Sequence, residues 1–329
     1  MKLFIPGAGQ KILHIKNFQE VPGVSSVIIS DTDPWAYGNF AADAAYTVPL
    51  FKSPEFMSAV KRIYEIERFD VLIPIHDAAL YVFSMDRNKY ANLPFTLAIN
   101  PKDTVDIVSD KLLTYEFFVK HEIPTATVYT IDAFRQLQGY TFPYFLKPRY
   151  IYMRGSESQI YMRIDGESDM ENIFGRIIGN ETQYVIQKFI CGDEINIDFF
   201  CDREGTVKSI VPVRRLGMGM SRGITRGEIL FDERFNYFVH MTAENLRLLG
   251  ANQIQVYVTE EKKLKFTEIN GRFSGSSVLV KEAGVNYFEY FIKLLNGEEI
   301  EIPEKPRDLK MCAWEKPYFF SDERSRHLM

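Results

Sequence analysis

The stretch KFTEINGRF, residues 265–273, decides how the second half of the chain is interpreted. Its alternation of apolar and polar residues predicts a strand. With a period of two, Glu268, Asn270 and Arg272 share one face, in a row that begins at Phe266. Carboxylate and amide oxygens suit Mg²⁺, which leaves its other positions to phosphates and water, and a guanidinium offsets phosphate charge.

Lysine, carboxylate and amide side chains occur along the chain in an order that suits a metal-bound triphosphate. Lys147 ends the apolar strand FPYFL and precedes Pro148-Arg149. Phosphoryl transfer needs positive charge around the phosphate oxygens, because its catalysis is mostly positioning and electrostatics. A lone lysine at a strand end is usually a solvated edge charge. The set as a whole favours a phosphate site, and its members are Lys111, Lys147, Glu194, Gln255, Glu268 and Asn270.

The first hundred residues alternate short apolar runs with helical patterns. The runs are LFIP (residues 3–6), VSSVIIS (24–30) and DVLIP (70–74). This rhythm predicts an α/β domain with a parallel sheet over residues 1–102.

The rest of the chain predicts two α+β units. An amphipathic helix pattern runs from residue 104 to Pro124, and TATVYT (125–130) follows as a strand, which places a small subdomain at residues 103–183. A larger one, 184–329, contains YVIQKFI (184–190), INIDFFCD (195–202) and SIVPVRR (209–215), which together suggest antiparallel pairing, and an accessory C-terminal strand (309–315).

Composition excludes several classes of protein. The formal net charge is -5 and the basic residues are scattered, so no nucleic-acid footprint is visible. The three cysteines form no CxxC pair, which argues against disulfides and a zinc site. Neither a signal peptide nor a membrane span is recognisable, so we expect a cytoplasmic protein with no membrane partner.

The glycine turn Gly7-Ala8-Gly9, with Asp31 ending the next strand, allows two interpretations. A dinucleotide fingerprint would need Gly or Ala where Ile12 stands, so the fingerprint is incomplete. A tight β-α turn is favoured, and a nicotinamide-dependent oxidoreductase stays a minor alternative.

Three further places carry candidate substrate residues. Asp77 follows a strand at the sheet edge where α/β proteins bind ligands, or it is a helix N-cap. Arg214 and Arg215 begin a segment rich in Gly, Met and Arg, which is either a loop that binds a carboxylate or an exposed hairpin connection. Ser274 opens SGSS, whose backbone amides hold an anion or cap a helix.

The chain resembles the ATP-grasp superfamily, and within it the carbamoyl-phosphate-synthase large-subunit-like group that includes amino-acid ligases. The segments that carry this resemblance are SDKLLTYEFF (109–118), FPYFLKPR (142–149), YVIQKFICGDEINIDFF (184–200), GANQIQVYV (250–258) and FTEINGRFSGSS (266–277). The resemblance implies two α+β subdomains that clamp ATP, behind a preceding α/β domain.

The resemblance also implies a role for each matching residue. Lys111, Lys147 and Arg149 would contact phosphate oxygens, and Glu194 the ribose. Glu268, Asn270 and Gln255 would bind Mg²⁺ or Mn²⁺, and Arg272 would stabilise the transferred phosphoryl group. Backbone groups of the hinge would meet adenine, and the hinge residues are Gln187, Lys188, Phe189 and Ile190.

The expected reaction joins a small carboxylate to an amine or ammonia through an acyl phosphate, with release of ADP and phosphate. One departure concerns the lid, where the family usually has a glycine-rich loop. Here the stretch is YIYMRGSESQI, so Gly155 and Ser156 are the lid candidates. This departure motivates the alternative of an ATP-binding sensor without turnover. A homodimer is the default expectation for an enzyme of this size.

Overall fold

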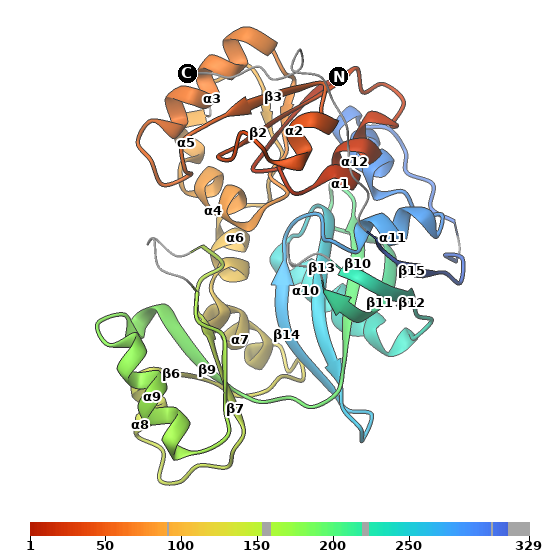
Figure 1. Ribbon diagram of the computed structural model, residues 1–329. Coiled ribbons are helices and arrows are strands. Elements are labelled where there is room, and N and C mark those ends of the chain that lie inside the picture. Colours follow the sequence, from red (N-terminus) through yellow and green to blue (C-terminus); the bar gives the residue numbers. More distant parts are fainter. Residues whose placement is uncertain (91, 153–158, 219–223, 304, 315–329) are drawn as a thin grey trace.

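The computed structural model describes residues 1–90, 92–152, 159–218, 224–303 and 305–314. It contains three sheets, and the helix pair α6 (Lys102–Ser109) and α7 (Lys111–Lys120) leads along the chain from the first sheet to the small one (Figure 1). No helix in these described ranges is long and apolar enough to cross a membrane.

The first sheet is parallel throughout, as the sequence predicts, in the order β3-β2-β1-β4-β5. Its strands are β1 (Lys2–Pro6), β2 (Ser26–Asp31), β3 (Ala44–Thr47), β4 (Val71–Leu72) and β5 (Thr96–Leu97). The helices around it are α1 (Ile12–Gln19), α2 (Tyr37–Ala41), α3 (Phe56–Glu67), α4 (Asp77–Met85) and α5 (Arg87–Tyr90). Both faces are covered, which explains why its strands are almost continuously apolar.

The largest sheet is antiparallel, in the order β14-β13-β10-β11-β12-β15. Its strands are β10 (Asp193–Cys201), β11 (Val207–Met218), β12 (Ile224–Ile229), β13 (Gly250–Val258), β14 (Leu264–Asn270) and the accessory strand β15 (Lys310–Cys312). Its helices are the 3-10 turn η2 (Glu233–Phe235), α10 (Asn236–Leu246), α11 (Ser277–Glu282) and α12 (Tyr287–Asn296).

Two hydrophobic cores hold the largest sheet in place. On one face, Phe200 packs in the same core as Tyr287 of α12, Phe18 of α1 and Leu3 of the first sheet. On the other, Phe199 packs with residues of α7 and α10. The first and largest sheets therefore share a core, which fixes their edges relative to each other.

The small sheet is antiparallel, in the order β6-β9-β7-β8. Its strands are β6 (Val128–Thr130), β7 (Tyr144–Pro148), β8 (Met162–Ile164) and β9 (Tyr184–Lys188), and its helical elements are α8 (Ile131–Arg135), α9 (Glu167–Ile177) and η1 (Glu181–Gln183). Ile186 of β9 packs in a core of its own with α8 and α9.

The position of β9 differs from the sequence expectation. We predicted that residues 184–190 pair with the two strands that follow, but β9 lies between β6 and β7. The expected boundary at residue 183 therefore cuts through the small sheet. The reason is that an apolar run such as YVIQ does not specify which partner strand satisfies it; the core beneath α8 and α9 does.

The predicted helix between residues 103 and 123 is two helices. Asp110 interrupts it with an extended backbone (φ -119°, ψ 112°), and its carboxylate accepts hydrogen bonds from the amides of Leu112 and Leu113. This is an N-cap, which satisfies two amides at the start of α7. Lys111 is therefore the first residue of a helix instead of a residue within one.

The glycine turn after β1 fits the tight-turn interpretation. Gly7 has a φ of +69°, and a Cβ at Gly9 would lie 2.3 Å from Asp31 Oδ2 and 2.5 Å from Ala36 Cβ. The Gly9 amide donates to the Asp31 carboxylate at 2.9 Å. Gly7 is therefore favoured by the backbone conformation, and Gly9 by the close approach of the Asp31 and Ala36 side chains.

Gly9→Ala should lower the free energy of unfolding by about 1–3 kcal/mol, since the added methyl overpacks the turn against Asp31 and Ala36. The matched control is Gly175→Ala, because Gly175 is exposed in α9 with open space where its Cβ would be. The control should gain up to about 1 kcal/mol. Urea unfolding curves measure both; equal midpoints for the two variants contradict the expectation.

Candidate active site

A cleft of about 830 Å³ lies where the three sheets meet. Its walls come from the carboxyl edge of the first sheet, from β7 and β9, and from β10, β13 and β14. Of the predicted site residues, the structure brings together in this cleft Asp77, Lys111, Lys147, Gln187, Glu194, Arg215, Gln255, Glu268, Asn270 and Arg272.

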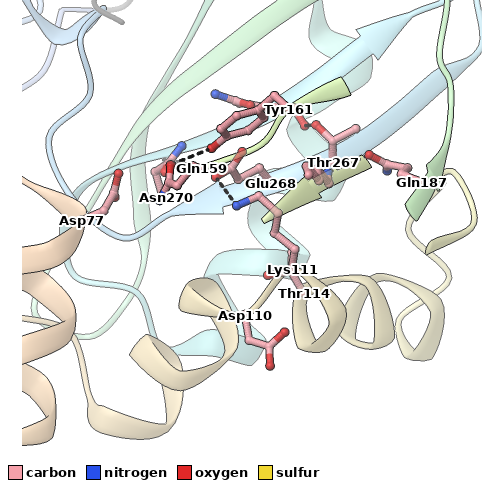
Figure 2. Close-up of polar contacts among 12 residues, drawn as sticks. Asp77, Asp110, Lys111, Thr114, Gln159, Tyr161, Gln187, Thr267, Glu268 and Asn270 are labelled. Carbon is pink, nitrogen blue, oxygen red and sulfur yellow. Dashed lines mark hydrogen bonds and ion pairs between the residues drawn. The ribbon is translucent and has the colours of Figure 1, made fainter. Parts of the chain in front are cut away.

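Two lysines enter the cleft from different elements. Lys111 Nζ lies 3.6 Å from Glu268 Oε1, and Figure 2 shows it reaching toward Glu268 while Asp110 points away. Lys147 of β7 is buried and donates to Gln187 Oε1 at 2.7 Å. Burial, together with Lys111, lowers the pKa of Lys147 to about 8. A negatively charged ligand would therefore stabilise the protonated form of this amine.

The metal candidates lie on β14, but the predicted row does not begin at Phe266. Gln255 of β13 pairs with Glu268, while Val256 pairs with Phe266, so Thr267 is an extra residue that forms a β-bulge. The bulge turns Phe266 into the core and lets Thr267 and Glu268 both line the cleft. Bulges redirect side chains in this way and commonly occur near active sites.

A chain of hydrogen bonds fixes the orientation of Asn270. Its Nδ2 donates to Gln253 Oε1 (3.2 Å), and Gln253 Nε2 donates in turn to Ser276 Oγ (2.9 Å), which donates to Asp198. Because the amide nitrogen of Asn270 is occupied, its Oδ1 is the atom presented for a ligand. Oδ1 accepts only a long contact of 3.4 Å from Arg272.

Asp198 anchors this chain from below the cleft. It is fully buried on β10 and accepts hydrogen bonds from the hydroxyls of Ser274, Ser276 and Ser277. Burial raises the pKa of Asp198 to about 6, although the serine hydroxyls pull in the opposite direction. Ser274 therefore supports the loop from within and does not itself line the cleft, unlike Ser276.

Arg272 forms a bidentate ion pair with Asp77 across the cleft floor. Nη2 lies 2.6 Å from Asp77 Oδ2, and Nε donates to Oδ1. Burial would raise the pKa of Asp77, but Arg272 holds it below its ordinary value. Asp77 is not the N-cap of α4; His76 is, since its Nδ1 accepts from the Ala78 amide at 3.2 Å.

Three buried polar atoms around the cleft have no hydrogen-bond partner within the described ranges. They are Gln187 Nε2, Glu194 Oε1 and Asn196 Oδ1. The other carboxylate oxygen of Glu194 accepts from Arg215 and from Tyr257 (3.1 Å). An unpaired buried polar atom costs about 1–3 kcal/mol, so these three atoms indicate a polar ligand that supplies the missing bonds.

Several predicted site residues do not line the cleft. Arg149 forms a bidentate pair with Asp110 (2.8–3.0 Å). Lys188 donates to Thr141 at 3.2 Å and lies over the Tyr144 ring. Phe189 lies under Arg163, and Ile190 is half-buried beyond β9.

Arg214, unlike its neighbour Arg215, points to the other face of β11. The two arginines differ because successive residues of a strand alternate between its faces. On its own face, Arg214 has its Nε 3.1 Å from Glu228 Oε1. The lid candidates Gly155 and Ser156 lie outside the described residues.

Sequence reasoning predicted Asp77 at the ligand-binding edge of the first sheet, but it did not assign Lys11 or Asp31 to the ATP site. Lys11, Asp31 and His76 line the cleft, and burial together with Arg272 lowers the pKa of Lys11. The signal was the glycine turn, which places Lys11 at the carboxyl edge of the sheet. Gln159 and Tyr161 also line the cleft and hydrogen-bond each other at 3.3 Å (Figure 2).

The donor set fits a hard cation that shares its ligands with a phosphate. Glu268 and Asn270 offer oxygen atoms, with Gln255 opposite Glu268. In the described part of the chain, no three His, Cys, Asp or Glu side chains cluster as a metal site. Mg²⁺ suits such a sparse set, because it keeps several waters and is held through substrate phosphates.

Comparisons with known proteins agree with this geometry. Residues 3–98 match the family described as "PylC-like, N-terminal domain", and residues 180–317 match "ATP-grasp in the biosynthetic pathway with Ter operon". The chain contains an ATP-grasp domain. The resemblance expected from the sequence is confirmed, as is the fold class of a parallel-sheet domain followed by antiparallel sheets.

Relatives of this ATP-grasp domain include ligases. A D-alanine–D-alanine ligase of Clostridium botulinum is 24% identical over 181 residues, which are 51% of this chain and 59% of that enzyme, so the match spans little more than half of the relative.

Two solved structures have similar folds. The biotin carboxylase of Campylobacter jejuni, solved as a β-γ-ATP complex, has a TM-score of 0.70 at 17% identity and covers 93% of this chain and 73% of its own. The L-amino acid ligase of Bacillus licheniformis has a TM-score of 0.67 at 18% identity and covers 89% and 74%. At such identities the likeness concerns the fold.

Asp198→Asn should lower the free energy of unfolding by about 1–3 kcal/mol, because an amide nitrogen would face a serine hydroxyl that now donates to a carboxylate. Asp132→Asn is the matched control, since the Asp132 side chain is 83% exposed, and it should change stability by less than about 0.5 kcal/mol. Thermal unfolding measures both variants. Wild-type stability in Asp198→Asn would contradict the role of the carboxylate as an anchor.

Proposed function

We propose that the chain is an ATP-dependent ligase that joins a carboxylate to an amine or ammonia through an acyl phosphate, releasing ADP and phosphate. The observation that carries the proposal is the convergence of Lys111, Lys147, Glu268, Asn270 and Arg272 in one cleft. The ligase relatives and the fold support it.

Lys111 and Lys147 would neutralise phosphate oxygens of ATP. The Lys111 ammonium lies 3.6 Å from Glu268 Oε1, and the Lys147 ammonium donates to Gln187 Oε1 at 2.7 Å. Burial lowers the pKa of Lys147, and repulsion between the two ammonium groups lowers it further. A bound triphosphate relieves that repulsion, which favours binding of ATP over binding of a neutral ligand.

The unpaired polar atoms suggest how the rest of the nucleotide is held. Glu194 Oε1, which has no hydrogen-bond partner among the described residues, would take a ribose hydroxyl, as the resemblance implies. Gln187 Nε2, beside Lys147, likewise has no acceptor in the described ranges and would donate to a phosphate or base acceptor. Adenine would meet the backbone of the hinge that begins at Gln187, a role that leaves the side chains of Lys188 and Phe189 in their present contacts.

Glu268 and Asn270, with Gln255, would hold Mg²⁺, which when bound supplies charge neutralisation between the phosphates. The fixed amide of Asn270 contributes by presenting Oδ1 toward the cleft without reorientation. Lys111, whose Nζ lies 3.6 Å from Glu268 Oε1, would hold that carboxylate in place. Preorganised charges of this kind cost no rearrangement during the reaction.

The chemical step would proceed by attack of a substrate carboxylate oxygen on the γ-phosphorus. The bond between this phosphorus and the ADP oxygen breaks, and an amine then attacks the acyl carbon and expels phosphate. Arg272 would stabilise the phosphoryl group, and its bidentate pair with Asp77 fixes the guanidinium plane. Of the other substrate candidates, Arg215 lines the cleft. The homodimer and the absence of a nucleic-acid partner stay predictions.

The first test replaces the amine by hydroxylamine and measures acyl hydroxamate formed from Mg·ATP with pooled amino acids and small carboxylates. Glu268→Gln should reduce the acid-dependent signal by at least about 100-fold, because it removes the charged metal ligand. Glu260→Gln, an exposed residue in the turn before β14, is the control and should match wild type. ATP binding without hydroxamate from any acid would favour a nucleotide sensor.

The second test concerns pH. Since the pKa of Lys147 is about 8 in the folded chain, the amine loses its proton above that pH, while the triphosphate is already fully ionised. ATP affinity should therefore fall by up to about tenfold per pH unit above pH 8. Lys147→Arg should remove this dependence, because arginine stays charged. Calorimetric titrations from pH 7 to 10 measure both proteins.

Without ligand, the stability of the wild-type chain should change in the opposite direction. Between pH 8 and the ordinary lysine pKa of 10.5, the unfolded lysine binds a proton that the folded one does not. Stability therefore rises with pH across this window.

An ATP affinity that stays constant from pH 7 to 10 in the wild type would contradict the assignment of Lys147.

A further inference from the structure

A second hollow of about 390 Å³ extends the cleft along the edge of the first sheet. We call it the side chamber. It shares Gly7, Asp31, His76, Ile151 and Gln159 with the central cleft, so the two spaces are continuous. Within the described residues, its lining contains none of the residues proposed to hold the nucleotide, the metal or the phosphoryl group.

The side chamber is mostly apolar, unlike the central cleft. The wall away from the cleft comes from the segment after β3, from the start of α3 and from the first turn of α4, and it consists of Val48, Pro49, Leu50, Phe51, Phe56 and Ala78. Polar side chains lie mainly at the mouth, where Asp31, His76 and Gln159 border the cleft. A ligand that enters from the cleft therefore passes from polar to apolar surroundings.

Aromatic contacts make the wall rigid. The Phe51 ring stacks on His76 with centroids 6.0 Å apart and meets Phe56 edge-on at 4.9 Å. A Cβ at Gly7 would lie 2.8 Å from Phe51 Cζ, so the glycine lets this ring approach the sheet edge. On the opposite side of the chamber, the backbone amide of Ile151 donates to the Ser109 carbonyl oxygen at 3.0 Å. This hydrogen bond ties the Ile151 side of the chamber to the end of α6.

The position of the side chamber relative to Arg272 favours the acid substrate as its occupant. His76 borders both spaces and precedes Asp77, whose partner Arg272 is the guanidinium proposed to face the phosphoryl group. An acid with its carboxylate near Arg272 would direct its side chain past His76 into the side chamber. An apolar cavity of about 150 Å³ already accommodates benzene, so the space is ample for a ring.

We propose that the side chamber binds the side chain of the acid substrate and selects acids with an apolar side chain of leucine to phenylalanine size. The inference rests on the proposed ligase function, since it takes the position of the carboxylate from Arg272. Burial of apolar surface is the source of the selectivity.

The test uses four carboxylates of rising side-chain size, namely acetate, butyrate, hexanoate and 3-phenylpropanoate, with their α-amino counterparts glycine, 2-aminobutyrate, norleucine and phenylalanine. Two readouts are taken on the full chain. The first is kcat/KM for acyl hydroxamate formation, in which hydroxylamine replaces the amine and only the acid varies. The second is binding of each acid to the nucleotide-free protein, by ligand-detected NMR.

The diagnostic variant is Leu50→Glu, which places a charge in the wall at a residue that is 55% exposed and therefore tolerant of substitution. Leu13→Glu is the matched control, because Leu13 is 52% exposed on α1 and outside the cleft and the chamber. Phe51→Leu is a second variant, which keeps the wall apolar but removes its ring and should weaken the preference for 3-phenylpropanoate and phenylalanine.

Wild type and Leu13→Glu should favour larger side chains by up to about fourfold per added methylene, and Leu50→Glu should lose this preference. A preference absent from both readouts, or unchanged in Leu50→Glu, overturns the proposal. Hydroxamate from no acid, together with NMR binding that keeps the size preference and its loss in Leu50→Glu, would retain the side chamber and reject the ligase function instead.

Discussion

The bidentate ion pair between Arg272 and Asp77 joins two parts of the chain that are 195 residues apart. Asp77 begins α4 at the edge of the first sheet, and Arg272 follows the last strand that carries metal candidates. Both side chains are partly buried, with 15% of Arg272 and 31% of Asp77 exposed, so loss of one partner leaves a charge that solvent compensates only in part. The pair therefore ties the Arg272 guanidinium, which we propose faces the phosphoryl group, to the sheet edge that would hold the substrate.

A second constraint acts from beneath the cleft. The buried carboxylate of Asp198 organises three serines at the start of α11, and its influence reaches Asn270 through Ser276 and Gln253. Side-chain amides present either an oxygen or a nitrogen to a ligand, and this chain of donors selects the oxygen. The metal candidates are thus oriented by residues that a motif on β14 does not contain.

Much of this arrangement follows from local sequence patterns. The apolar strands of the first domain, the accessory strand β15 and the types of residue in the cleft were all predicted. Patterns failed where a partner had to be chosen: β9 joined the small sheet, and a bulge at Thr267 moved Phe266 into the core. Likewise, Arg149 pairs with Asp110. Asp110 is a helix cap that can be recognised only once α6 and α7 are known to be two helices.

The sequence by itself determined which elements form and which chemical groups are available, since periodicity, glycine turns and residue types act over a few neighbouring positions. It also determined the ATP-grasp resemblance, because each matching segment is a continuous stretch of sequence. Only the tertiary structure decided that Lys11, Asp31 and His76 join the cleft, that Arg214 does not, and that an apolar chamber opens beside it. These outcomes depend on which surfaces face each other across three sheets, and packing between distant segments leaves no local pattern.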